Sequence, residues 1–194
     1  MTNGLPAPPP TDVYLSFVGI IAFPWTQCLR NILCGFASQG VKKITILMSS
    51  PGGSIIEGFA LYNLIRALPF ECNMHNIGSI HSIANIVFLA GENRSAAKYS
   101  TFMLHNFTWT FAQETLTVPQ VSEKVMSLDV ARKEFVGIFE DRTNLKAGDF
   151  DAEKFFDNPR TLDSAAAAKA GMVQTVVDFK IPAGSTVLNV IQGP

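Results

Sequence analysis

Along the first half of the chain, short apolar segments alternate with longer amphipathic segments. The short segments have the apolar content of buried strands, and they cover residues 13–21, 43–48, 71–77 and 101–104. The amphipathic segments have the length and spacing of helices, and they cover residues 26–39, 56–68 and 82–90. This alternation predicts an α/β fold, in which parallel strands are joined by right-handed crossover helices.

The second half of the chain is dominated by one long helical segment, residues 117–142. Thr117 and Gln120 form the pattern of a capping box, and Pro119 stands in the first turn, where proline is tolerated. A helix of this length would extend roughly 39 Å, which is more than a small domain needs for itself. We expect part of it to project and pack on another subunit. The alternative is that all its apolar residues belong to the core of one domain.

With 194 residues, the chain is long enough for one domain with a substantial core. The last predicted elements are a helix capped by Asp163 and a final strand, at residues 164–170 and 172–179. We expect three parts: a Pro-rich arm, a single domain and a loosely held tail, at residues 1–12, 13–181 and 182–194.

The composition argues against several classes of partner. The net charge of -1 lacks the basic excess of a nucleic-acid surface, and no apolar stretch is long enough to span a bilayer. The three cysteines, Cys28, Cys34 and Cys72, form no metal-type pair. We therefore predict no nucleic acid, no membrane, no metal, no cofactor and a reducing cytoplasmic location.

Groups suited to chemistry follow the predicted strands. Gly52 and Gly53 come after the second strand, the turn from Gly78 to Ser82 comes after the third, and His105 follows the fourth. In an open parallel sheet, reactive groups collect outside the carboxyl ends of the strands. This coincidence favours an enzyme, although Ser79 and Ser82 alone could be ordinary turn and cap residues.

These groups match the needs of a serine nucleophile. A serine hydroxyl requires a base to take its proton, and the tetrahedral intermediate requires donors for its oxyanion. Ser82 is the candidate nucleophile and His105 the candidate base, separated by one helix and one returning strand. The backbone N–H groups of Gly53 and Ile83 are the candidate oxyanion donors.

Three motifs resemble those of the Clp protease proteolytic subunit and its relatives, including ClpP-like phage head proteases. They are SSPGGS at 49–54, Gly78-x-x-x-Ser82, and FMLH at 102–105, and the resemblance covers roughly residues 13–179. It implies a ClpP/crotonase-like fold, a repeated ββα spiral whose long helix projects as a handle. It also implies a serine endopeptidase that hydrolyses peptide bonds in peptides or unfolded proteins. The subunits of such enzymes assemble as a homo-oligomeric ring, of seven subunits or two stacked rings of seven.

The resemblance also assigns roles to residues. Ser82 would be the nucleophile, His105 the general base, and Gly53 and Ile83 the oxyanion donors. The segment after Gly52 would pair with an extended peptide as an added strand, and its substrate-binding residues would be Gly52, Ser54 and Ile55.

The sequence departs from the family pattern at three places. His81 precedes the serine, where small residues are usual, and we expect it to have a structural or rim role. Pro159 occupies the position of the triad aspartate, and a shifted loop would supply Asp157 or, as the weaker choice, Asn158. The short N-terminal arm lacks the length of the segment that helps engage a ring ATPase, so no ATPase partner is implied.

Two other functions fit parts of the pattern. A non-catalytic ring subunit or scaffold would explain Pro159 and the altered flanks of Ser82. An acyl-CoA enzyme of the crotonase type would use the oxyanion donors but would give the pair of Ser82 and His105 no task.

Overall fold

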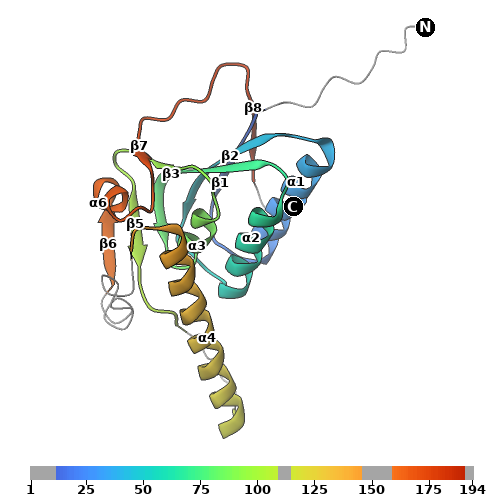
Figure 1. Cartoon of the computed structure of the whole chain (residues 1–194). Helices are drawn as coiled ribbons and strands as arrows, with labels where there is room; N and C mark the ends of the chain where they lie inside the picture. Colours follow the sequence, from blue (N-terminus) through green and yellow to red (C-terminus); the bar gives the residue numbers. More distant parts are fainter. Residues whose placement is uncertain (1–11, 109–114, 146–158, 191–194) are drawn as a thin grey trace, which may run out of the picture.

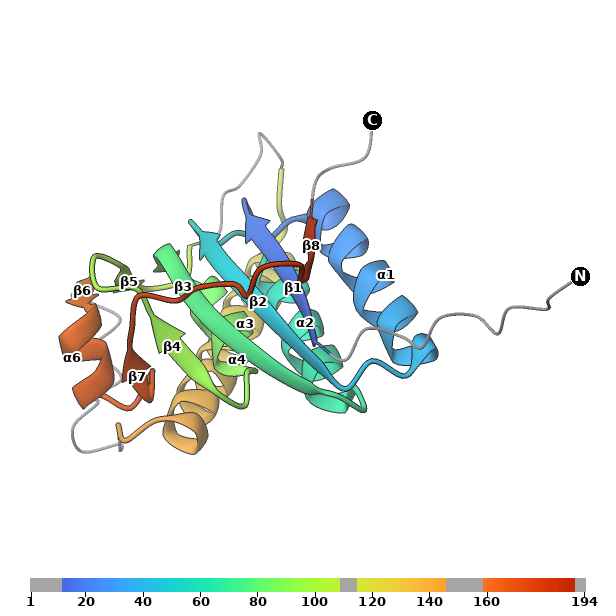
Figure 2. The same cartoon turned by 90° about the horizontal axis from the view of Figure 1, so that it is seen from above.

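The computed structural model describes residues 12–108, 115–145 and 159–190. Within these residues the strands form one eight-stranded sheet with the central order β6-β5-β3-β2-β1-β8, while β4 pairs with β3 and β7 (Figures 1 and 2). The strands are β1 Asp12–Val18, β2 Lys43–Ser50, β3 Glu71–His81, β4 Arg94–Ala96, β5 Thr101–Leu104, β6 Arg160–Asp163, β7 Thr175–Val176 and β8 Thr186–Asn189. Most pairs are parallel, as predicted, and β5 with β6 is antiparallel.

The described helices are α1 Phe23–Gln39, α2 Ile55–Ala67, α3 Ala84–Leu89, α4 Val118–Arg142 and α6 Ser164–Lys169. Helices α1, α2 and α3 pack on one face of the sheet, where alternate residues of each central strand are buried against them (Figure 2). Helix α4 starts far from the sheet and packs against the domain from Leu128 onward, with Phe135 and Phe139 buried (Figure 1). The prediction that part of this helix projects from the domain is therefore confirmed.

The opposite face of the sheet is crossed by the extended segment between β7 and β8 (Figure 2). The Phe179 ring in this segment lies 4.9 Å from the ring of His75 on β3 and 6.1 Å from that of Tyr14 on β1. Beyond it, β8 pairs in parallel with β1. The expectation of a loosely held tail is therefore wrong for residues 186–189, because they pair with the edge of β1. The tail has no periodic pattern in its sequence that would predict this strand.

The third strand is longer than the sequence indicates. The expected strand ends at Ile77 with a break at Gly78, whereas β3 continues to His81 and pairs with β5. Gly78 serves close packing here, since a Cβ at this position would lie 2.8 Å from Ser49 Oγ. The ends of β2 and β3 are irregularly paired between Met48 and Ser50, and this bulge re-aims the chain just before the glycine pair.

Candidate active site

Ser82 stands on a tight turn between β3 and α3. Its φ of 55° makes it the one non-glycine residue with a positive φ in the described part of the chain. The Ser82 N–H donates to the carbonyl of Met103 on β5 at 2.9 Å, which anchors the turn to the neighbouring strand. A strained conformation of this kind at a strand-to-helix turn is typical of a residue held for chemistry.

Gly52 lies directly against this serine. Its φ is 92°, and a Cβ at this position would lie 2.7 Å from Ser82 Cβ and 3.4 Å from Ser82 Oγ. The Gly52 carbonyl accepts from the Ile21 N–H at 2.8 Å, so this stretch of backbone is held in place. The glycine therefore allows both a left-handed backbone and close approach of the β2 end to the serine.

The backbone N–H groups of Gly53 and Ile83 are the two expected oxyanion donors. Gly53 forms a parallel bridge with Ile21, and the bonds of that bridge use the groups of its neighbours Gly52 and Ser54, so the Gly53 N–H points away from Ile21. The Ile83 N–H follows the serine at the entrance to α3. For neither N–H does the described structure contain an acceptor. This pair has the chemistry of an oxyanion hole.

His105 follows β5 and is half-buried. Its Nδ1 lies 2.7 Å from the carbonyl oxygen of Asn106, which can only accept, so Nδ1 is the donor of this bond, and in the neutral ring Nε2 is the nitrogen that keeps its lone pair. This tautomer suits a general base acting through Nε2. In the described part of the structure, no hydrogen bond joins His105 to the Ser82 hydroxyl.

His81 lies close to His105. The pKa of His81 is lowered by burial and, to a smaller extent, by the charge of His105. The sheet explains the proximity, because His81 pairs with Met103 on β5, and His105 follows Met103 by two residues, directly after the strand ends. The sequence did not reveal this, since the pairing of β3 with β5 beyond Gly78 was not predicted.

Asp157 and Asn158, the candidates for a third triad member, lie outside the described residues. Pro159 precedes β6, whose antiparallel register with β5 pairs Arg160 with Leu104. Continued by one residue, that register would set position 159 opposite His105. The start of β6 is thus at the correct edge of the sheet to present a group to the histidine.

The residues expected to bind substrate after Gly52 differ in what they contact. The Ser54 side chain caps α2 by accepting from the Glu57 N–H at 3.3 Å. Ile55 lines a cleft of about 290 Å³ between α2 and α4. The other lining residues of this cleft are Ile56, Phe59, Ser127, Leu128, Val130, Ala131 and Glu134. The cleft is mainly apolar, which suits a hydrophobic side chain of a substrate.

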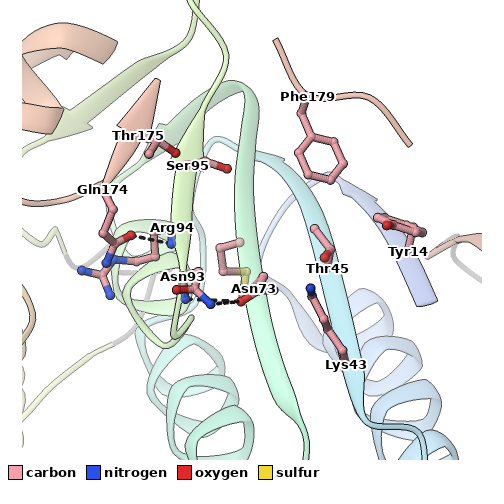
Figure 3. A pocket seen from close by; sticks show the side chains of 11 residues that line it. Tyr14, Lys43, Thr45, Asn73, Asn93, Arg94, Ser95, Gln174, Thr175 and Phe179 are labelled. Atoms are coloured by element: carbon pink, nitrogen blue, oxygen red, sulfur yellow. Dashed lines mark hydrogen bonds between the residues drawn. The ribbon is translucent and has the colours of Figure 1, made fainter. Parts of the chain in front are cut away.

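A second cleft, of about 260 Å³, lies on the opposite face of the sheet near Phe179 (Figure 3). Its polar groups largely bind one another: the Arg94 N–H donates to Gln174 Oε1 at 2.6 Å, and Asn93 Nδ2 donates to Asn73 Oδ1 at 2.9 Å. Neither Ser82 nor His105 lines this cleft. It is therefore separate from the serine site.

Within residues 12–108, 115–145 and 159–190, no group of three or more His, Cys, Asp or Glu side chains is arranged to hold a metal ion. No helix in the described part of the chain has both the length and the apolar character needed to cross a bilayer. Burial raises the pKa of the Cys72 thiol to about 12, so this cysteine is a core residue and not a nucleophile.

A serine on a strained turn, a histidine directly after the neighbouring strand β5, and two N–H groups with no acceptor among the described residues are typical of serine hydrolases. The family model of Clp protease matches residues 26–180, more than half of the chain. The chain belongs to the Clp protease family.

Individual relatives agree with this assignment. An ATP-dependent Clp protease proteolytic subunit 2 from Borreliella burgdorferi is 31% identical over 141 residues, which cover 72% of this chain and 69% of that subunit. An ATP-dependent Clp protease proteolytic subunit from Chlorella vulgaris is 26% identical over 160 residues, which cover 78% of this chain and 77% of that subunit. The structure of a ClpP1 mutant from Listeria monocytogenes superposes with a TM-score of 0.76 at 17% identity, covering 86% of this chain and 92% of that one. The predicted ClpP-like fold is thus confirmed.

Proposed function

We propose that the protein is a serine endopeptidase of the Clp type, with Ser82 as nucleophile and His105 as general base. The observation that carries the proposal is the strained turn at Ser82, set beside the open N–H groups of Gly53 and Ile83. Membership of the Clp protease family supports peptide-bond hydrolysis as the reaction. The substrate would be a peptide or an unfolded protein in the cytoplasm.

In the proposed reaction, Ser82 Oγ attacks the peptide carbonyl carbon while His105 Nε2 takes the hydroxyl proton. The carbonyl oxygen becomes an oxyanion that accepts from the Gly53 and Ile83 N–H groups. Collapse of this intermediate breaks the C–N bond, and the imidazolium of His105 gives its proton to the leaving amine. Water, deprotonated by His105, then releases the acyl group from the serine.

Asp157 is the proposed third member, acting on His105 Nδ1. At present that nitrogen binds the Asn106 carbonyl at 2.7 Å, so a carboxylate would replace the carbonyl as its partner. A carboxylate would also stabilise the imidazolium formed during the reaction. Gly52, Ser54 and Ile55 would line the path of the extended peptide, with a substrate side chain in the apolar cleft between α2 and α4.

We also propose that the subunits form a homo-oligomeric ring, of seven or of two stacked sevens, with contacts along α4. Support comes from large exposed apolar side chains on this helix: Val118, Val121, Val125, Met126 and Val130. Apolar residues that stay exposed on a projecting helix favour burial against another subunit. An ATPase partner is not part of the proposal.

The test is intact-mass spectrometry after incubation with a fluorophosphonate probe. We expect one adduct on the wild type, none on Ser82→Ala, and one on Ser79→Ala, since the Ser79 hydroxyl is bonded to Thr101 Oγ1 at 3.1 Å on β5. Asp157→Ala is expected to slow labelling by about 100-fold or more, and Asn158→Ala to leave it nearly unchanged. A folded, assembled wild type without adduct would reject the peptidase and favour a non-catalytic ring subunit.

A further inference from the structure

Asn85 lies three residues after the candidate nucleophile, in the first turn of α3, and its side chain is completely buried. Its Nδ2 donates to the Ser82 carbonyl and to the Met103 carbonyl, each at 2.9 Å. Carbonyl oxygens only accept, so the orientation of the amide follows from these two partners. One side chain thus joins the serine turn to β5.

Neither carbonyl needs this amide for a partner. The Met103 carbonyl already accepts from the Ser82 N–H at 2.9 Å, and the Ser82 carbonyl already accepts from the Asn85 N–H at 3.1 Å. The amide also has a cost, because its Oδ1 is buried and has no hydrogen-bond partner among the described residues. An isosteric apolar side chain would leave both carbonyls paired and remove the orphaned acceptor. The hydrogen bonding of the two carbonyls therefore does not by itself require an asparagine at this position.

The two bonds restrain geometry. They end on the same two residues that the Ser82–Met103 backbone bond joins, so together with that bond they limit movement of the serine turn against β5. His105 follows Met103 by two residues, directly after the end of β5. The distance between the serine hydroxyl and the histidine therefore depends on how firmly the turn is held to this strand. Small displacements of a nucleophile lower reaction rates strongly.

We propose that Asn85 is a positioning residue, which holds Ser82 in register with His105 through the Met103 carbonyl. The proposal rests on the proposed function, since it assigns a role within the same site. Asn85 would touch neither substrate nor reacting atoms.

Asn76 provides a matched control. It is also fully buried and also joins β3 to β5, because its Nδ2 donates to the Thr101 carbonyl at 2.9 Å. Its Oδ1 accepts from the Gly78 N–H at 2.9 Å, so its amide is used on both sides and contacts neither Ser82 nor Met103. Asn76 should therefore matter for stability, and Asn85 for reactivity.

The experiment compares the full-length wild type, Asn85→Leu and Asn76→Leu. Thermal melting gives stability, and the fluorophosphonate labelling rate at saturating probe gives reactivity of the folded protein. For Asn85→Leu we expect a labelling rate at least about tenfold lower than that of the wild type. The probe concentration at half-saturation should stay within about twofold of the wild-type value, and the melting temperature should be equal or higher. For Asn76→Leu we expect a lower melting temperature and a labelling rate close to that of the wild type.

Asn85→Asp gives a second test with nearly the same side-chain shape. At about pH 6 a buried carboxyl stays neutral and donates to one carbonyl, whereas at about pH 8.5 a carboxylate faces two carbonyl oxygens and is repelled. The ratio of wild-type to Asn85→Asp rates should therefore grow by about tenfold over this range. A purely structural role would shift melting and leave the labelling profile of the folded protein unchanged.

Labelling of Asn85→Leu within about twofold of the wild type would overturn the positioning role while the proposed function stood. Marked destabilisation of both Asn85 variants would overturn it in favour of a structural role. A wild type that takes no adduct would instead reject the proposed function, and the positioning role with it.

Discussion

Backbone conformation at single residues determines how the serine is presented. A left-handed conformation costs a non-glycine residue about 1 kcal/mol, and Ser82 at φ 55° accepts this cost. The surrounding hydrogen bonds to Met103 hold the turn in this state. Gly52 at φ 92° has the same backbone requirement, and it adds a steric one, since its missing side chain leaves room for Ser82.

Comparing Gly52→Ala with Gly40→Ala should separate the backbone requirement from the steric one. The new Cβ would lie 2.7 Å from Ser82 Cβ, so we expect loss of stability together with a fall of about 100-fold in fluorophosphonate labelling. Gly40→Ala is the control, because Gly40 also has a positive φ of 74°, but the described residues place nothing within 4 Å of the added Cβ. It should lose about 1 kcal/mol of unfolding free energy and label normally. Equal labelling of the two variants would contradict the crowding argument.

Buried histidines should make stability depend on pH. Burial lowers the pKa of His75 and of His81 below the ordinary value of 6.5. The unfolded chain then binds more protons than the folded chain, so the contribution to stability is complete above about pH 6.5 and is lost as the pH falls below it. His75→Gln should flatten this acid-side decline, measured as urea unfolding free energy between about pH 5 and 8. A decline as steep as that of the wild type would exclude His75 as a cause.

At the scale of elements, α3 depends on its packing. Its six residues are all buried, and a helix this short does not form by itself in water. At its N-terminal side, Ile83 packs against Gly58 of α2, where an added Cβ would overlap Ile83 Cγ1. At its C-terminal side, the Arg142 guanidinium donates to the Leu89 carbonyl at 3.0 Å. Helices α2 and α4 therefore determine where the entrance of α3 presents the Ile83 N–H.

Gly58→Ala should test this dependence. The methyl group would push Ile83 and with it one proposed oxyanion donor, so we expect lower stability and labelling slower by about tenfold or more. Gly35→Ala in α1 is the matched control, since its Cβ would meet nothing within 4 Å. It should raise the unfolding free energy by about 0.5–1 kcal/mol and leave labelling unchanged. A Gly58→Ala protein that labels like the wild type would show that α3 tolerates displacement.

At the scale of the whole molecule, α4 divides into an anchored and an exposed part. Phe135 and Phe139 are buried and stacked with ring centroids 4.7 Å apart, so the C-terminal half belongs to the core. In the N-terminal half, Val118 is 81% exposed and Met126 is 67% exposed. One subunit alone leaves this apolar surface uncovered, and the proposed ring would cover it.

Met126→Glu should therefore weaken assembly without unfolding the subunit. Burying the new carboxylate in an apolar interface is unfavourable, so we expect a smaller particle mass in size-exclusion chromatography with light scattering. Ser127→Glu adds the same charge at an exposed polar position of α4 and should shift the mass less. Circular dichroism should be unchanged for both. An unchanged mass for Met126→Glu would place the subunit contacts elsewhere.

The sequence by itself determined the elements whose signals are local. The expected helix at 117–142 corresponds to α4 Val118–Arg142, and the expected strand at 101–104 matches β5, because caps, proline and side-chain periodicity act within a few residues. Ser82 and His105 are predicted as candidate site residues in the same way, because they follow strands in the sequence. The sequence also predicts close approach of the backbone at Gly52 and Gly53, because glycine has no side chain to prevent it.

The tertiary structure decided everything that depends on pairing between distant segments. The extension of β3 to His81, the proximity of His81 to His105, and the addition of β8 to β1 all arise from hydrogen bonds across the sheet. The role proposed for Asn85 also depends on such pairing, because its side chain can bind the Met103 carbonyl only when β5 lies beside the serine turn. Such contacts have no local pattern, because their free energy depends on which strand edge is available once the core has formed.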